Sequence, residues 1–287
     1  MEAPVRDDCR IGGMVVAEVC RNVAGKRPTP WEDVRDVASY WHLLANLVHR
    51  DLTVRYKRSI LGFFWTLLNP LLMMVILTVV FSHFFRFAIL HYEIYFLSEF
   101  LVWMFFAQTT ANSMASLAWN GPLMKRVRLP KTIFALAGTV AGMINLLLSC
   151  GPLIAIMLVV GAPVRPALLV LPLSFLVIAV FTLGVSLGLS ALAVYFDDVA
   201  QMYQVGIMGL MYLTPIMYPL DILPDRFRWL VEFNPLTKLF ELARYPIYHG
   251  QLPPLAVFGV GVALALGALV LGWTVFRRLA GGFYLHL

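Results

Sequence analysis

The side chains that could do chemistry in this chain do not assemble into a catalytic motif. An ATP-binding loop of the form G-x-x-x-x-G-K-[ST] is absent: the one Gly-Lys pair, Gly25-Lys26, lacks the upstream glycine and the following hydroxyl. Neither H-E-x-x-H nor G-x-S-x-G occurs. Cys9, Cys20 and Cys150 have no metal-ligand spacing and are too scattered for a disulfide framework. We therefore predict that the chain is no enzyme and holds no metal or cofactor of its own.

One acidic side chain, Glu99, lies within a long apolar segment. An ionisable group at membrane depth is usually functional. The alternative is that Glu99 lies at headgroup depth or pairs with a base such as Arg244 or Lys238. A proton- or sodium-coupled carrier would need more such groups than this chain offers, so we expect the energy for transport to come from another protein.

The composition is that of a polytopic membrane protein. Of the 287 residues, 60% are hydrophobic and 13% are charged, against roughly 45–50% and 25% in soluble domains. A spanning helix needs about 20 mostly apolar residues. Six stretches meet this need, at residues 60–85, 94–119, 133–160, 167–195, 202–220 and 255–276. We predict an all-α membrane protein with six transmembrane helices within residues 59–278.

The second of these stretches is polar in its later half. It carries Gln108, Thr109, Thr110, Asn112, Ser113 and Ser116. Lipid offers such groups no hydrogen bonds, so we expect this stripe to face other helices or a wet cavity.

The basic residues indicate the orientation of the chain in the membrane. They gather before the first stretch (Arg50, Arg55, Lys57, Arg58), between the second and third (Lys125, Arg126, Arg128, Lys131) and after the sixth (Arg277, Arg278). Short segments rich in Lys and Arg stay in the cytoplasm. We therefore predict a multi-pass protein of the cytoplasmic (inner) membrane with cytoplasmic tails at residues 1–30 and 279–287. The net charge of +6 arises at this inner rim and gives no sign of nucleic-acid binding.

Residues 31–58 form a separate predicted element. Apolar residues recur there at steps of three and four, at Val34, Val37, Trp41, Leu44, Val48 and Leu52. The pattern predicts an amphipathic helix at the inner membrane interface, and a helix packed on a partner protein is the alternative. The residues assigned to that interface are Trp41, Arg50, Arg55, Tyr56, Lys57 and Arg58.

Residues 221–254 are too many for a tight turn and too apolar for a solvated loop. Asn234-Pro235 divides two apolar groups, and a residue before proline is pushed out of helical geometry. The pattern predicts two short helices that re-enter the outer side of the membrane. A cap lying flat on the headgroups is the alternative.

Aromatic residues crowd the first two predicted spans and the loop between them. Many belong to interface belts or to helix packing, yet aromatic faces also suit sugar rings, whose C–H faces are apolar. The candidates for a channel lining or an outer gate are Trp65, Phe100, Trp103, Tyr212, Tyr218, Phe227, Trp229, Asn234 and Phe240.

Three motifs resemble a known family. They are RDLTVRYKRSILGFFWTLLNPLL at residues 50–72, YLTPIMYP at residues 212–219 and NPLT at residues 234–237. Together they resemble the permease subunits of type-2 ABC exporters, in the branch that exports O-antigen, teichoic acid and capsule polysaccharides. The resemblance covers most of the chain, from about Trp41 to Arg278.

This resemblance implies a homodimer that works with two copies of a separate ATPase, which would bind ATP and Mg. The two halves would enclose a channel for a lipid-linked glycan. Residues 121–131 would be the coupling loop on the ATPase, with Lys125, Arg126, Arg128 and Asp198 as contact residues. The alternative is that these bases only set the topology. The chain departs from the family at Asp197, where an Arg is common, which puts an inner salt bridge in doubt.

Other functions remain open at this point. The same topology serves permeases for a small lipid or drug, and only the aromatic content and the first motif favour a glycan. An integral membrane acyl- or glycosyltransferase should show paired carboxylates or a partnered His near a span end, and no such set is evident.

Overall fold

The structure, a computed structural model, describes residues 39–56, 64–80, 89–121, 129–196 and 198–283. The chain divides into two units, residues 1–40 and 41–287, and of the first only Ser39 and Tyr40 are described. Every regular element among the described residues is helical, and they contain no strand. The predicted all-α class is therefore confirmed for the described part of the chain.

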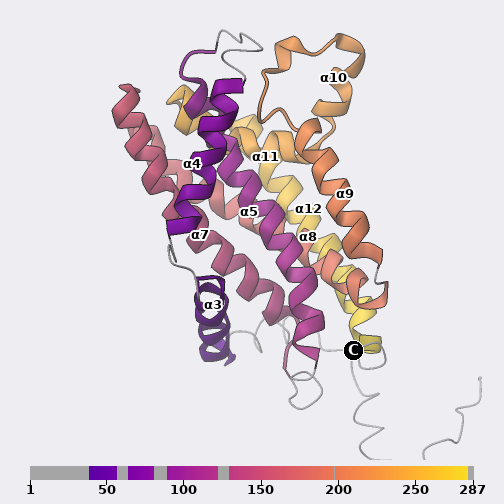
Figure 1. The fold of residues 1–287 in the computed structure, drawn as a ribbon. Helices are drawn as coiled ribbons and strands as arrows, with labels where there is room; N and C mark the ends of the chain where they lie inside the picture. Colours follow the sequence, from indigo (N-terminus) through magenta and orange to yellow (C-terminus); the bar gives the residue numbers. More distant parts are fainter. Residues whose placement is uncertain (1–38, 57–63, 81–88, 122–128, 197, 284–287) are drawn as a thin grey trace, which may run out of the picture. The chain divides into compact units, whose positions relative to one another are not determined.

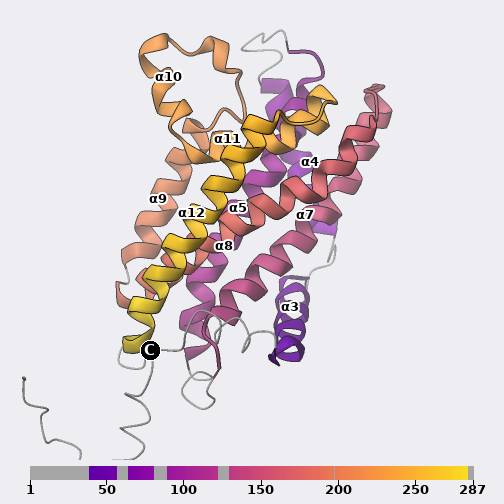
Figure 2. The same ribbon diagram turned by 180° about the vertical axis from the view of Figure 1, so that it is seen from behind.

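The second unit is a bundle of helices with short elements at its ends (Figure 1). In chain order the elements are α3 (Trp41–Tyr56), α4 (Phe64–Val79), α5 (Tyr92–Trp119), α7 (Thr132–Val160), η2 (Pro166–Val170), α8 (Leu171–Tyr195), α9 (Asp198–Leu213), η3 (Leu220–Ile222), α10 (Asp225–Glu232), α11 (Pro235–Arg244), η4 (Tyr245–His249), α12 (Leu255–Leu279) and η5 (Ala280–Gly282). One end of the bundle carries α3 and the other α10 and α11, as both ribbon views show (Figures 1 and 2). We call these the α3 end and the α11 end.

Among the described residues, four helices are long and apolar enough to cross a membrane: α5, α7, α8 with its preceding η2, and α12. They coincide with the second, third, fourth and sixth predicted spans to within three residues at each end. The two remaining predicted spans correspond to α4 and α9, which have 16 residues each. Parts of the predicted span 60–85 lie outside the described residues, so six spans remain a prediction.

The fifth predicted span, 202–220, differs from the helix in its place. Helix α9 begins at Asp198, four residues earlier, and ends at Leu213. Proline lacks the backbone N–H and restricts the residue before it, so Pro215 does not continue a helix. The chain turns there instead, with the Ile216 amide donating to the Thr214 carbonyl at 2.7 Å.

Helix α12 lies along α8, and small residues bring the two backbones together. A Cβ on Gly272 would overlap the carbonyl oxygen of Gly184, and a Cβ on Gly184 would overlap the backbone of Ala268. Small residues at such crossings allow close helix packing without a water-driven hydrophobic effect.

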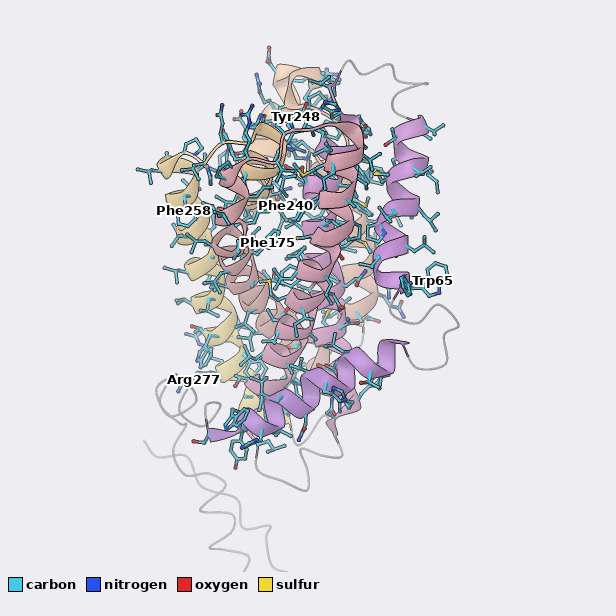
Figure 3. All side chains as sticks on the ribbon, turned by 90° about the vertical axis from the view of Figure 1, so that its left-hand side faces the viewer. Trp65, Phe175, Phe240, Tyr248, Phe258 and Arg277 are labelled. Atoms are coloured by element: carbon cyan, nitrogen blue, oxygen red, sulfur yellow. The ribbon has the colours of Figure 1, made fainter. Side chains whose placement is uncertain are left out.

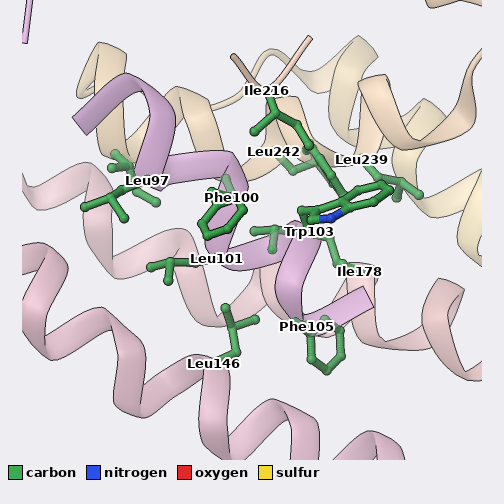
Figure 4. Close-up of a cluster of buried hydrophobic side chains, with 14 of the residues drawn as sticks. Leu97, Phe100, Leu101, Trp103, Phe105, Leu146, Ile178, Ile216, Leu239 and Leu242 are labelled. Carbon is green, nitrogen blue, oxygen red and sulfur yellow. The ribbon is translucent and has the colours of Figure 1, made fainter. Parts of the chain in front are cut away.

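The buried apolar side chains form two clusters. The larger lies between α5, α8 and α11 and includes Phe96 and Phe240. Figure 4 shows part of it, with Trp103 of α5, Ile178 of α8 and Leu239 of α11. The smaller lies at the α3 end and joins residues of α3, α7, α8 and α12 to Phe283. The described part of the bundle therefore has two apolar cores, and the smaller of them lies at the α3 end.

Candidate functional site

A cavity of about 780 Å³ lies between α3, α4, α5 and α7. Its polar lining residues carry amides and hydroxyls: Asn69, Gln108, Thr109, Asn112, Ser116, Asn120, Asn145 and Ser149. Aromatic rings border it at Trp65, Phe105 and Trp119. Arg50 and Asp51 are the charged residues of the lining, and their opposite charges cancel.

The polar side of the cavity comes from one face of α5. Gln108, Asn112, Ser116 and Asn120 follow one another at intervals of four residues, and side chains four apart lie on the same helix face. Asn145 and Ser149, also four apart, add the facing row from α7. The predicted placement of the polar stripe against other helices and a cavity is therefore confirmed.

The rest of the α5 stripe is buried between helices and has local partners. Ser113 Oγ donates to the Thr109 carbonyl at 2.8 Å, and Thr110 Oγ1 donates to the Phe106 carbonyl at 2.7 Å. Thr110 Oγ1 also hydrogen-bonds to the Tyr203 hydroxyl of α9. Thr109 differs: its hydroxyl oxygen is buried and has no hydrogen-bond partner among the described residues.

At the α3 end of the cavity, the polar groups are already engaged. Arg50 Nη1 donates to Asn120 Oδ1 at 3.0 Å, and Arg50 Nη2 forms an ion pair with Asp51 Oδ1 at 3.0 Å. Asn120 Nδ2 in turn donates to the Ser116 carbonyl at 2.7 Å. This network belongs to the lining of the cavity and ties α3 to the end of α5.

Helix α3 packs on α7 through one face, which carries Leu43, Leu44, Leu47, Val48 and Leu52. Leu44, Val48 and Leu52 belong to the predicted apolar stripe, but Trp41 does not follow it: the indole is 58% exposed and lies beside His42. The side chains of Arg55 and Tyr56, and residues Lys57 and Arg58, lie outside what the structure describes.

At the α11 end, Glu99 pairs with Arg244 in the interior. Arg244 Nη2 lies 2.8 Å from Glu99 Oε2, and the two side chains are 10% and 1% exposed. The same Nη2 donates to the Pro215 carbonyl at 2.9 Å, and the guanidinium carbon lies 3.9 Å from the Tyr95 ring centroid. Pairing with Arg244, an alternative considered for Glu99, is therefore confirmed, whereas Lys238 pairs with Glu241 at 3.3 Å.

This cluster fixes the turn that follows α9. The hydroxyls of Tyr92 and Tyr95 donate to the carbonyls of Met217 and Tyr218 at 2.9 and 3.0 Å. Asn234 caps α11 by accepting from the Leu236 amide at 3.0 Å and donates to Thr214 Oγ1 at 2.9 Å. The motifs at residues 212–219 and 234–237 thus meet in space.

The predicted lining and gate residues fall into different environments. Trp65 borders the cavity at the lower end of α4, where Figure 3 shows it far from Tyr248 at the α11 end. Phe100, Trp103 and Phe240 lie in the larger apolar cluster and are not among the residues that line the cavity. Figure 4 shows the first two. The others lie near the α11 end: Tyr212, Phe227 and Trp229 are exposed, Tyr218 is partly buried and Asn234 is buried.

The predicted ATPase contacts are described only in part. Asp198 is exposed in the first turn of α9, where a carboxylate suits the helix dipole. Lys125, Arg126 and Arg128 lie outside the described residues. The two short predicted helices are present as α10 and α11 and divide at Asn234, although their depth in a membrane is not given by the fold.

Two features of the site escaped the sequence reasoning. Asn145 and Ser149 complete the polar cavity from α7, and their four-residue spacing in an apolar span was the available signal. Lys131, Tyr195 and Phe283 form a contact at the α3 end across wide sequence separations, for which no local pattern exists.

Comparison with known proteins places the chain in a family. Residues 42–248 match the family described as ABC-2 type transporter. The chain is 32% identical over 213 residues to the O-antigen export system permease protein RfbA of Klebsiella pneumoniae, covering 73% of this chain and 82% of that protein. It is 27% identical over 242 residues to the RfbA of Myxococcus xanthus, covering 84% and 92%. It is 22% identical over 212 residues to the capsule polysaccharide export inner-membrane protein CtrC of Neisseria meningitidis, covering 70% and 77%. With most of its length matched, the chain belongs to the ABC-2 type transporter family.

Proposed function

We propose that this chain is the permease subunit of an ATP-driven exporter that moves a lipid-linked polysaccharide across the cytoplasmic membrane. Membership of the ABC-2 family supports the transport role. The names of its relatives, which are permeases for O-antigen and capsule export, support the substrate class. The chain lacks the ATP-binding loop motif, and this fits a separate ATPase that supplies the energy for transport.

The working assembly we propose is a homodimer of this chain with two ATPase subunits that bind ATP and Mg. In it α4 and α9 supply the first and fifth of six spans, and α3 lies at the inner interface. Residues 121–131 enter the ATPase as the coupling loop, and α10 and α11 form the outer gate. Both chain ends are then cytoplasmic, as the basic residues predict.

The observation that carries the substrate proposal is the lining of the cavity. Amides and hydroxyls can exchange hydrogen bonds with sugar hydroxyls, and the rings of Trp65, Phe105 and Trp119 can pack on apolar sugar faces. The lining formed by the described residues has no net charge, because Arg50 and Asp51 pair with each other. These features favour uncharged sugar residues over a polyanionic chain.

A permease for a small lipid or drug is the second candidate. The specific observation in its favour is size, since a cavity of about 780 Å³ is in the range of drug-sized sites. A mostly apolar lining with a few polar groups is usual for such sites, whereas this cavity adds rows of amides and hydroxyls from α5 and α7.

The test is deletion of the gene in its host, followed by analysis of the surface glycan and of lipid-linked glycan inside the cell. We expect loss of the surface glycan and accumulation of its lipid-linked form, with both restored by the unaltered gene. A strain that keeps its surface glycan and instead becomes sensitive to a small lipid or drug would favour the second candidate.

The cavity is tested in the same strain with the double variant Gln108→Leu/Asn112→Leu. We expect roughly a tenfold loss of surface glycan at unchanged protein abundance, because leucines cannot replace the hydrogen bonds to sugar hydroxyls. The matched control is Leu266→Ala/Val270→Ala on α12, whose side chains are exposed and do not line the cavity.

A further inference from the structure

The end of α12 is tied to two other helices through its last carbonyl groups. Lys131 Nζ donates to the Ala280 carbonyl at 2.6 Å, and the Tyr195 hydroxyl donates to the Leu279 carbonyl at 2.7 Å. The final carbonyls of a helix have no partner within the helix. Here side chains from the start of α7 and the end of α8 supply those partners.

Phe283 completes this contact from the other side of the turn η5. Its ring is fully buried and lies edge-on to Phe276, with centroids 5.5 Å apart, and 6.0 Å from the Tyr195 ring. Lys131 Nζ lies 4.9 Å from the Phe283 centroid, within the range of a cation–π contact. A Cβ on Gly282 would overlap the Tyr195 hydroxyl, so glycine allows the close approach.

Lys131 is well suited to this position. Its ammonium is close to the negative end of α12, where a cation is favoured. Burial lowers the pKa of the Lys131 side chain to about 8, which still leaves it largely a charged donor at neutral pH.

The residues in this contact stand next to two segments that the sequence predicts to face the ATPase. Lys131 is the last residue of the predicted coupling loop 121–131, and α7 follows at once. Tyr195 ends α8, and Asp198 follows three residues later. The contact therefore links residues beside both segments to the end of α12. Helix α12 itself packs along α8.

We propose that Lys131, Tyr195 and Phe283, with the Leu279 and Ala280 carbonyls, form a clasp that makes both ATPase-facing segments and the end of α12 move as one body. The proposal rests on the proposed function, because it concerns how ATP hydrolysis in the partner reaches the bundle. Without the clasp, a push on the coupling loop would be absorbed by bending at the start of α7. With it, the same push displaces α7, α8 and α12 together. The three side chains are positioning residues and need not touch the substrate.

The test uses the full complex of permease and ATPase reconstituted in proteoliposomes. The variant is Lys131→Met/Tyr195→Phe, which removes both side-chain donors and keeps their bulk. We expect glycan exported per ATP hydrolysed to fall about fivefold to tenfold, since one ordinary hydrogen bond shifts an equilibrium by about that factor. ATP hydrolysis and membrane insertion should stay close to those of the unaltered complex, and Tm should fall only slightly, as expected for the loss of two ordinary hydrogen bonds.

Two further variants separate positioning from a merely structural role. Lys131→Arg in a chain that keeps Tyr195 retains a charged donor. It should therefore show most of the glycan export per ATP of the unaltered complex. The matched control is Tyr245→Phe in η4, the same loss of a hydroxyl outside the clasp and outside the proposed gate helices α10 and α11, where no change in the ratio is expected. If the double variant does not fold, Tyr195→Phe alone, which deletes one hydroxyl, is measured instead. The clasp predicts that glycan exported per ATP falls in this variant as well.

A measurement that needs no glycan tests the clasp independently of the proposed function. Trp65→Cys in the cavity is labelled with a thiol reagent, in a background where the three native cysteines are serine, with and without vanadate-trapped nucleotide. The clasp predicts that the nucleotide-dependent change in labelling rate collapses in Lys131→Met/Tyr195→Phe while ATP hydrolysis continues. An unchanged labelling response, or an unchanged export ratio, would overturn the clasp. Failure of the unaltered complex to export any glycan would instead contradict the proposed function.

Discussion

The cavity and the Glu99–Arg244 cluster lie in different parts of one bundle and use polar groups in opposite ways. In the cluster, the charged groups are buried, and Arg244 contacts a carboxylate, a carbonyl and an aromatic ring. In the cavity, uncharged amides belong to the lining, and the charged lining residues among those described, Arg50 and Asp51, pair with each other. The charged groups therefore fix the turn after α9, whereas uncharged polar side chains line the cavity.

Breaking the ion pair should have the largest effect on stability. Arg244→Leu leaves the Glu99 carboxylate buried without its partner, which costs about 3–5 kcal/mol in comparable cases. We expect a marked loss of folded protein and a lower Tm in detergent. The control Lys238→Leu breaks a more exposed pair with Glu241, worth about 0–1 kcal/mol. Equal Tm values for the two variants would show that the buried pair does not hold this end together.

Replacing both partners sharpens the distinction between an uncompensated charge and a missing contact. Glu99→Leu/Arg244→Leu should recover most of the stability lost by Arg244→Leu, because apolar residues often replace a buried pair at no net cost. Folded abundance and Tm measure the recovery. Export should remain impaired in the double variant, because the Pro215 carbonyl loses its bond to Arg244. Full recovery of both stability and export would mean that the pair has no role in positioning the turn.

Thr109 and Thr110 allow the smallest and finest test, since they are neighbours on α5 with opposite hydrogen bonding. Thr110 bonds to Phe106 and Tyr203, so Thr110→Val should cost about 1 kcal/mol. Thr109 has no described partner for its hydroxyl, so Thr109→Val should be neutral or slightly stabilising. Tm measurements on the two variants in the same detergent compare them. A larger loss from Thr109→Val would indicate that its hydroxyl is bonded to water in the cavity.

The sequence predicted the elements better than the directions of their side chains. The four long helices and the division at Asn234 followed from apolar run lengths and proline stereochemistry. For Glu99 the sequence left several placements open, and the structure selects the pairing with Arg244. Phe100 and Trp103 could not be assigned in the same way. Both rings come from the mostly apolar first half of α5, where no periodicity shows which face meets α8 and which meets the cavity, and both are in the core.

The clasp lay beyond sequence reasoning for a different reason. Lys131 and Ala280 are 149 residues apart, so only the tertiary arrangement of α7, α8 and α12 brings them together. Lys131 also belongs to a loop whose basic residues can be explained by the positive charge of cytoplasmic segments. Its composition therefore gave no reason to expect that Lys131 donates to the Ala280 carbonyl.

The central claim, that the cavity contacts the exported glycan, is tested most directly by photo-cross-linking in cells. A benzophenone amino acid is placed at Asn112 in the cavity or, as the control, at Leu266, which is exposed on α12. Our account predicts a glycan-bearing adduct at position 112 that requires active ATPase, and none at position 266. An adduct at 266 with none at 112, in cells that export normally, would contradict it.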